Sequence, residues 1–250
     1  MQTEENSNPA AKIVPDELSN LSKKEQVAEM FNSIAGKYDF LNHTLSMGID
    51  RGWRKKAINQ VALVNPKNIL DVATGTADLA IAAAALNPGR IVGVDIADGM
   101  LEIGRKKIAE RKLSHIVSLQ NADSEHLPFP NNQFDAVTCA YGVRNFENLH
   151  AGLAEMSRVM RPGGKLAILE FSRPKSFPVK QLFSLYFRYV LPTLGRIVSK
   201  HSRAYTYLNE SAMAFPEGSD FCNALQKCGF KDPKATRLSF GITTLYTASK

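Results

Sequence analysis

Between residues 68 and 171 the chain alternates between short apolar runs and stretches with the spacing of an amphipathic helix. The apolar runs predict strands over 68–73, 90–95, 116–121, 134–140 and 165–171. The helical spacing predicts helices over 78–86, 100–112 and 151–160. Strands that alternate with helices build a parallel sheet covered on both faces. This part of the sequence therefore predicts an α/β fold.

The alternation stops after residue 171. The stretch FPVKQLFSLYFRYVLPTLGRIVSKH is apolar without a strand pattern, and we expect residues 175–215 to form an inserted helical lid. The segment AYTYLNESAMAFPEGSDFCNALQKCGF predicts two helices, the second ending at Gly229. The run KATRLSFGITTLYTAS predicts a β-hairpin around Gly241. The hairpin brings the predicted sheet to seven strands, mostly parallel, with an antiparallel pair at its C-terminal end.

The N-terminal part is expected to lie outside the sheet. Residues 1–22 are rich in Asn, Pro, Glu and Ser, which predicts a mobile arm, and residues 23–250 are expected to form a single domain. A helix is predicted over 24–34, with Val27 and Phe31 on one face, followed by a turn-rich aromatic segment and a helix that carries Trp53. We expect 23–62 to form a helical cover.

Composition narrows the classes of function. The net charge of +7 favours an anionic partner without choosing one, and the basic residues are spread along the chain without interleaved aromatic residues, which argues against nucleic acid. Three cysteines without C-x-x-C spacing and five scattered histidines predict no metal site. No stretch reaches 18 apolar residues and no signal peptide begins the chain, so a cytoplasmic protein is expected.

The loop DVATGTAD, residues 71–78, lies between a predicted strand and a predicted helix. A P-loop would need a lysine that is absent here, and a dinucleotide loop would need several glycines where this loop has only Gly75. Acids stand at both ends, Asp71 and Asp78, which disfavours a phosphate. A cationic ligand without phosphates, such as S-adenosyl-L-methionine, fits the loop better.

Two further acids follow the next strands. Asp95 ends the second strand, where a carboxylate can accept hydrogen bonds from both ribose hydroxyls of either NAD or S-adenosyl-L-methionine. Asp123 and Ser124 follow the third strand and can accept from an adenine amino group, with Leu127 and Phe129 as an apolar wall. The carboxyl ends of parallel strands meet at the ligand-binding edge of an open α/β sheet. We therefore expect these residues to share one site.

A family resemblance rests on these segments. ILDVATGTADLA, VGVDIADGMLEIGR, NADSEHLPFPNNQFDAV and RVMRPGGKLAILEFSRP together resemble the class I S-adenosylmethionine-dependent methyltransferases. MFNSIAGKYDFLNHTLSMGIDRGWRK, YGVRNFENL and AYTYLNESAMAFPEG resemble the ubiquinone/menaquinone biosynthesis C-methyltransferase family, from about residue 27 to the C-terminus. The resemblance implies a Rossmann-like fold with helices on both faces of the sheet, S-adenosyl-L-methionine as cofactor and a polyprenyl quinol as substrate.

The resemblance also implies roles for single residues. Thr76 is expected to contact the cofactor, Asp95 its ribose, and Asp123 with Ser124 its adenine. The complete set expected to bind the cofactor is Asp71, Gly75, Thr76, Asp95, Met100, Asp123, Ser124 and Ala140. The family often has glycines where this chain has Thr74 and Ala77, and serine where it has Ala140, so a contact at Ala140 would come from the backbone.

Methylation of a quinol ring carbon requires a nucleophilic ring, and loss of a hydroxyl proton makes the ring nucleophilic. Arg144 stays protonated, so we expect it to stabilise the phenolate or to polarise a water, with Asn145 orienting that water or the ring oxygen. Tyr38 is expected at the quinol, although packing alone explains it equally well. For Arg144 the alternative is an ion pair with a nearby carboxylate such as Glu147. Tyr205, Tyr207, Ser211 and Phe215 are lid candidates, and His201 is expected on the surface.

Several alternatives stay open from the sequence. The apolar, basic-edged stretch 177–198 is explained by peripheral contact with the inner face of the cell membrane, by an internal helix or by a homodimer contact. The competing activities are a nicotinamide-dependent oxidoreductase and a methyltransferase of another lipophilic ring. An amine acceptor is disfavoured, because Cys139 to Gly142 lack the Asn/Asp-Pro-Pro-aromatic tetrad. Menaquinone and ubiquinone precursors are not distinguished.

Overall fold

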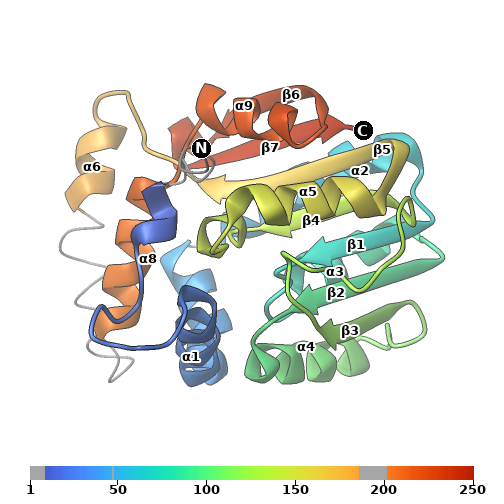
Figure 1. Cartoon of the computed structure of the whole chain (residues 1–250), viewed down its shortest axis with the longest axis horizontal. Helices are drawn as coiled ribbons and strands as arrows, with labels where there is room; N and C mark the ends of the chain where they lie inside the picture. Colours follow the sequence, from blue (N-terminus) through green and yellow to red (C-terminus); the bar gives the residue numbers. More distant parts are fainter. Residues whose placement is uncertain (1–8, 47, 186–201) are drawn as a thin grey trace, which may run out of the picture.

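The computed structural model describes residues 9–46, 48–185 and 202–250. Its centre is a seven-stranded sheet in the order β3-β2-β1-β4-β5-β7-β6 (Figure 1). The strands are β1 Asn68–Val72, β2 Arg90–Asp95, β3 Val117–Asn121, β4 Phe134–Ala140, β5 Met160–Phe171, β6 Lys231–Leu238 and β7 Thr243–Ser249. The first five are parallel, and β7 pairs antiparallel with both β5 and β6. The predicted α/β fold with a C-terminal hairpin is confirmed.

Helices cover both faces of the sheet and its carboxyl edge. The helices are α1 Lys23–Leu45, α2 Asp50–Val61, α3 Asp78–Ala83, α4 Asp98–Glu110, α5 Leu149–Val159, α6 Val179–Leu185, α8 Ser202–Ala214 and α9 Ser219–Lys227. Short 3₁₀ turns are η1 Pro9–Lys12, η2 Ala62–Val64, η3 Ala84–Leu86, η4 Val143–Asn145 and η6 Ser239–Gly241. Figure 1 shows α1 and α8 beyond the arrowheads of the parallel strands. No helix in the described part of the chain is long and apolar enough to cross a membrane.

The core has two halves, one on each face of the sheet. Successive residues of β1 point to opposite faces, so Leu70 and Val72 pack with α5 and α9 while Ile69 packs with α2, α3 and α4. Trp53 of α2 is buried in the second half and donates a hydrogen bond from Nε1 to Ser239 Oγ at 2.9 Å. This bond ties α2 to the hairpin at the carboxyl edge.

The structure differs from the sequence expectation at α1. The helix was expected to stop at residue 34, but it continues through Gly36 to Leu45. Glycine disfavours a helix interior, yet Ala35 and Tyr38 pack against Ala97 and Met100 beside the second strand. Tertiary packing on this face therefore overrides the turn-rich composition.

Smaller differences lie at element ends. β5 begins at Met160, five residues before the expected strand, because Met160 pairs with Phe134 across an irregularity in the register. α5 accordingly ends at Val159. The predicted helix 78–86 ends in a 3₁₀ turn after Ala83.

The expected arm and the expected lid are described only in part. Within 9–22, Ala10 is buried and its carbonyl accepts from Lys23 Nζ at 2.5 Å, and Asp16 N donates to Gln26 Oε1 at 2.8 Å. Residues 1–8 and 186–201 lie outside the described residues. The mobile arm and the lid boundaries remain predictions.

Candidate active site

The loop after β1 wraps around a buried carboxylate. Asp71 is almost inaccessible to solvent, and it accepts hydrogen bonds from Thr74 Oγ1 and Thr138 Oγ1, both at 2.6 Å. Burial raises the pKa of Asp71 to about 6, although the two threonine hydroxyls act against the rise. Asp71 therefore fixes the loop from beneath.

The loop backbone adopts left-handed conformations that L-residues disfavour. The φ angles of Ala73, Gly75 and Ala77 are +51°, +55° and +66°. A left-handed alanine costs on the order of 1 kcal/mol or more, so tertiary contacts must hold the turn. One such contact is the hydrogen bond from Thr74 N to Val94 O at 2.9 Å. This bond holds the loop after β1 against β2.

Asp95, at the end of β2, faces this loop. Its carboxylate accepts hydrogen bonds from Gly75 N at 2.8 Å and Ala97 N at 2.9 Å. Burial raises the pKa of Asp95, and the backbone donors act against the rise. The acid predicted to bind a ribose therefore lies directly beside the glycine of the loop.

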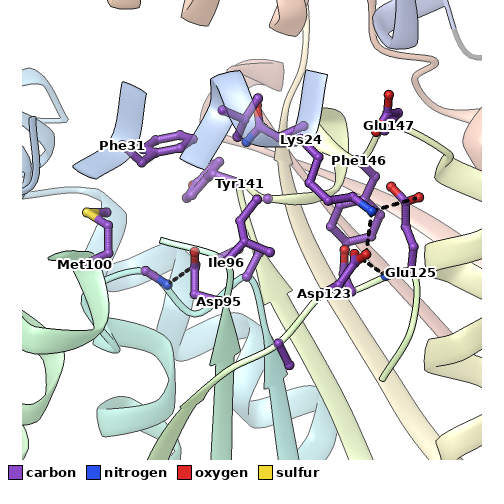
Figure 2. A pocket seen from close by; sticks show the side chains of 18 of the residues that line it. Lys24, Phe31, Asp95, Ile96, Met100, Asp123, Glu125, Tyr141, Phe146 and Glu147 are labelled. Carbon is purple, nitrogen blue, oxygen red and sulfur yellow. Dashed lines mark hydrogen bonds and ion pairs between the residues drawn. The ribbon is translucent and has the colours of Figure 1, made fainter. Parts of the chain in front are cut away.

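Asp123 follows β3 and forms an ion pair with Lys24 of α1 (Figure 2). It also accepts from Glu125 N at 2.9 Å. Partial burial acts to raise the pKa of Asp123, but the hydrogen bond from Lys24 and that from Glu125 N outweigh it and lower the pKa. Lys24 also lies 3.8 Å from Glu125. The acid that was predicted to bind the adenine is therefore paired with a lysine of α1.

These residues line one pocket between α1 and the carboxyl ends of β1 to β4. It contains about 660 Å³ free of protein atoms, a volume that includes the part open to solvent. The lining residues are Lys24, Val27, Phe31, Tyr38, Ala73, Gly75, Asp95, Ile96, Met100, Ala122, Asp123, Ser124, Glu125, Ala140, Tyr141, Gly142, Asn145, Phe146 and Glu147. Figure 2 shows Met100 and Asp95 on one side and Asp123 on the other.

Most of the expected site residues meet in this pocket. Tyr38, Gly75, Asp95, Met100, Asp123, Ser124, Ala140 and Asn145 all line it. Asp71, Thr76 and Arg144 do not. Thr76 Oγ1 instead donates to Asp39 Oδ1 at 2.5 Å and accepts from Lys107 Nζ at 3.2 Å. The roles of all eleven residues in binding or catalysis remain predictions.

The loop acids do not face the pocket, contrary to our argument from the sequence. Asp78 forms ion pairs with Lys107 and, at 3.2 Å, with Arg54 Nη2. The lining is nevertheless acidic, because the side chains of Asp95, Asp123, Glu125 and Glu147 outnumber the single cation Lys24. The preference for a cationic ligand therefore comes from acids after β2, β3 and β4.

The segment after β4 closes the pocket floor. Tyr141 has a φ of +60°, and its ring stacks on Phe171 with centroids 4.5 Å apart. A Cβ added to Gly142 would lie 2.5 Å from Ala73 Cβ, a distance that real Cβ contacts do not show. Gly142 therefore lets the loops after β1 and β4 touch.

Arg144 forms a buried ion pair, but not with the partner considered from sequence. Its Nη1 donates to Glu170 Oε1 at 2.7 Å and to Tyr141 O at 2.6 Å, and its guanidinium lies 5.5 Å from the Phe171 ring centroid. The alternative of an ion pair with a nearby carboxylate is thus confirmed, but the carboxylate is Glu170 and not the suggested Glu147. Glu170 was detectable as a lone acid in the apolar strand AILEF, at the end of a strand next to β4.

A helical cover containing Tyr38 was expected from the sequence, but the contribution of Lys24, Val27 and Phe31 of α1 to the pocket lining was missed. Lys24, Val27, Phe31 and Tyr38 line the pocket from one face of this helix. The apolar face containing Val27 and Phe31 was visible in the sequence, but its spacing did not say which surface it would cover. Lys24 stands three and seven residues before Val27 and Phe31, so the helical spacing could have placed it on the same face.

The residues that were candidates for the lid have different surroundings in the structure. Tyr207 is buried and donates to Asn145 Oδ1 at 3.1 Å, whereas Phe215 packs in the core and Ser211 Oγ bonds to Leu208 O. His201 and the Tyr205 side chain lie outside the described residues. In the described ranges no three His, Cys, Asp or Glu side chains form a group suited to a metal ion.

Comparison with known proteins places this geometry in a family. The profile of the ubiE/COQ5 methyltransferase family matches residues 19–250. A demethylmenaquinone methyltransferase of Bacteroides fragilis is 50% identical over 244 residues, 97% of this chain and 99% of the relative. The ubiquinone/menaquinone biosynthesis C-methyltransferase UbiE of Geobacter sulfurreducens is 42% identical over 230 residues, 91% of this chain and 90% of the relative.

Solved structures agree on the architecture. A SAM-dependent methyltransferase from Thermotoga maritima superposes with a TM-score of 0.61 at 17% identity, covering 89% of this chain and 98% of that one. At this identity the likeness shows the fold alone. The profile match and the near full-length relatives go further: the chain belongs to the ubiE/COQ5 methyltransferase family.

Proposed function

We propose that this chain transfers the methyl group of S-adenosyl-L-methionine to a ring carbon of a demethylated polyprenyl quinol, demethylmenaquinol first. The observation that carries the proposal is the 50% identity, over 97% of the chain, to a demethylmenaquinone methyltransferase. The ubiquinone precursor is the second candidate acceptor, because a relative at 42% identity is named for both quinones.

The pocket lining suits the methyl donor. Asp95 offers a half-buried carboxylate to two ribose hydroxyls, and Asp123 offers one to an amino group. Phe31, Met100 and Phe146 supply apolar walls. When bound, the donor supplies an already activated methyl group on a cationic sulfur. A lining with four carboxylates and one lysine favours a cation without phosphates.

The residues after β4 would act on the acceptor. Arg144 keeps its charge, because Glu170 holds the pKa of the guanidinium high against the effect of burial. Its charge would stabilise the ring oxygen as the hydroxyl proton leaves, which pushes electron density onto the adjacent carbon. Asn145 and Tyr38 line the pocket and would orient the ring. The Asn145 side chain is itself held by Tyr207.

We further propose that the carboxyl edge contacts the inner face of the membrane that holds the quinol. Phe177, Leu185 and Phe240 are 81%, 54% and 80% exposed, and Lys175 and Lys180 flank Phe177. The Phe240 turn joins the end of β5, since Ser172 Oγ donates to Gly241 O at 2.8 Å. Exposed apolar side chains beside cations are typical of interfacial segments. The stretch 186–198, also considered for this role, lies outside the described residues.

The experiment for the activity is direct. The protein is incubated with S-adenosyl-L-methionine and, separately, with demethylmenaquinol and with the demethylated benzoquinol, and each product is weighed by mass spectrometry. We expect one added methyl group with demethylmenaquinol. Binding of NADH in place of S-adenosylhomocysteine, with no methylated product from either quinol, would refute the proposal.

A further inference from the structure

Glu170 is a fully buried acid at the carboxyl end of β5. Its side chain has no solvent exposure, and its Oε1 accepts from Arg144 Nη1 at 2.7 Å and from Phe171 N at 2.8 Å. Arg144 is 2% exposed and is fixed a second time by the carbonyl of Tyr141. The ion pair therefore joins the ends of β4 and β5 at the base of the site.

The pair is not fully satisfied. Arg144 Nε and Glu170 Oε2 are both buried without a hydrogen-bond partner among the described residues. Unmet buried polar atoms cost on the order of 1 kcal/mol or more each. Stability is a poor reason to keep such a pair, since apolar residues of similar volume often replace a buried ion pair without loss. A role in the reaction explains it better.

The charge of the pair reaches the residues expected at the acceptor. Tyr38 and Tyr207 both interact electrostatically with Arg144. Tyr38 lines the pocket, and Tyr207 holds Asn145, which also lines it. Arg144 does not itself line the pocket, so any effect of its charge on a bound acceptor passes through the neighbouring residues that do, Gly142 and Asn145.

We propose that Glu170 is a positioning residue for methyl transfer: its carboxylate orients the Arg144 guanidinium and sets how much positive charge Arg144 presents to the acceptor oxygen. This inference rests on the proposed function. With Glu170 in place, the Arg144 guanidinium is held through Nη1 beneath the pocket, and its positive charge is partly balanced. Without the carboxylate, Arg144 is a less well-oriented and uncompensated cation.

Other titratable groups face the pair and must be considered in any pH profile. They are Tyr38 and Lys23 of α1, Cys139 of β4, Tyr141 after β4, Tyr207 of α8 and Tyr246 of β7. Burial lowers the pKa of Lys23 to about 8 and raises that of Tyr246 to about 12, and it also raises the pKa of Cys139, Tyr141 and Tyr207. Lys23, with a pKa of about 8, and Asp71, with a pKa of about 6, also titrate in the range of the rate profile, so its acid limb is assigned by comparing the Glu170 variants with the wild-type protein.

The test is Glu170→Gln, which keeps the shape and removes the charge. We expect kcat to fall about tenfold or more, because the Arg144 guanidinium loses its ionic partner and is held by a neutral amide oxygen, with the KM for S-adenosyl-L-methionine within about twofold. We also expect the acid limb of kcat to move to lower pH, because an uncompensated Arg144 favours the phenolate. A folded variant with wild-type kcat and an unmoved limb would overturn the proposal.

Two further variants make the result decisive. Glu170→Asp keeps the charge and shortens the reach, so we expect lower kcat with the acid limb unmoved; wild-type kcat in this variant overturns the proposal even where Glu170→Gln fails to fold. Asp135→Asn is the matched control, since it breaks the 2.6 Å pair with Arg161 at the opposite edge of the sheet and should lower Tm alone. Failure of the proposed function is distinguishable, because the wild-type protein would then form no methylated quinol.

Discussion

Asp71 shows how one residue can shape a site without lining it. The carboxylate is sealed beneath the loop after β1 and holds Thr74 and Thr138. Sequence reasoning put it in contact with the ligand, because an acid before a glycine turn suggests a ligand contact. The distinction depends on where the two threonine hydroxyls point, which the sequence pattern does not specify.

Asp71→Asn should change how stability depends on pH. Because burial raises the pKa from 3.8 to about 6, the folded protein binds more protons than the unfolded chain between these values. Relative to Asp71→Asn, the wild-type protein should therefore lose roughly 3 kcal/mol of unfolding free energy as pH rises from about 3 to about 7, most of it between 3.8 and 6. Urea unfolding of both proteins across this range measures the difference; parallel pH curves would contradict it.

Arg144→Ala should reduce turnover far more than cofactor affinity. Electrostatic stabilisation of a developing oxyanion is worth on the order of a hundredfold in kcat, and the charge of Arg144 is expected to supply it from beneath the pocket. The residue does not line the pocket, so the Kd for S-adenosylhomocysteine should stay within about threefold. Because the change leaves Glu170 buried and unpaired, kcat is normalised to the folded fraction by circular dichroism. Unchanged turnover would remove Arg144 from the reaction.

At the scale of elements, α1 connects the whole carboxyl edge. Lys23 Nζ lies 3.5 Å from Arg144 O after β4, and Lys24 pairs with Asp123 after β3. Asn32 Oδ1 accepts from Gly99 N, after β2, at 2.8 Å. Asp39 accepts from Thr76, after β1. One helix thus has a polar contact with each of four loops around the pocket.

Asp39→Ala should speed the release of S-adenosylhomocysteine, the product left by the methyl donor. Asp39 binds both Thr76 and Lys107, so its loss frees one end of α1 from the loop after β1. We expect S-adenosylhomocysteine to dissociate about tenfold faster in stopped-flow fluorescence, consistent with a loss of one or two charge-assisted bonds. Glu29→Gln, at an exposed position of the same helix, is the charge-matched control. Equal release rates in both variants would show that the contact does not hold the cover closed.

The strands of the sheet were more predictable than its cover. Strands β2 and β4 have the bounds expected from their apolar runs, since a buried strand is specified by its own residues. The length of α1 was not predictable, because it depends on Ala35 and Tyr38 meeting Ala97 and Met100. Asp95 and Asp123 were found because each ends or follows a strand, whereas Lys24 and Glu170 needed the tertiary structure.

At the scale of the molecule, the carboxyl edge combines the pocket with exposed apolar side chains. If Phe177, Leu185 and Phe240 enter a lipid interface, the protein should sediment with anionic liposomes at low salt. Replacing Phe177 and Phe240 by serine should weaken sedimentation severalfold while leaving the Tm unchanged, since both are about four-fifths exposed. Absence of sedimentation, with a dimer in light scattering, would assign this surface to a second copy of the chain.

The pocket beneath α1 is expected to direct the methyl group to a ring carbon of the quinol. The most direct measurement uses S-adenosyl-L-methionine with a trideuterated methyl group and demethylmenaquinol, with NMR of the purified product. We expect the label on a ring carbon, both ring oxygens unmethylated, and loss of product formation in Arg144→Ala. Label on a ring oxygen, or no labelled quinol at all, would contradict it.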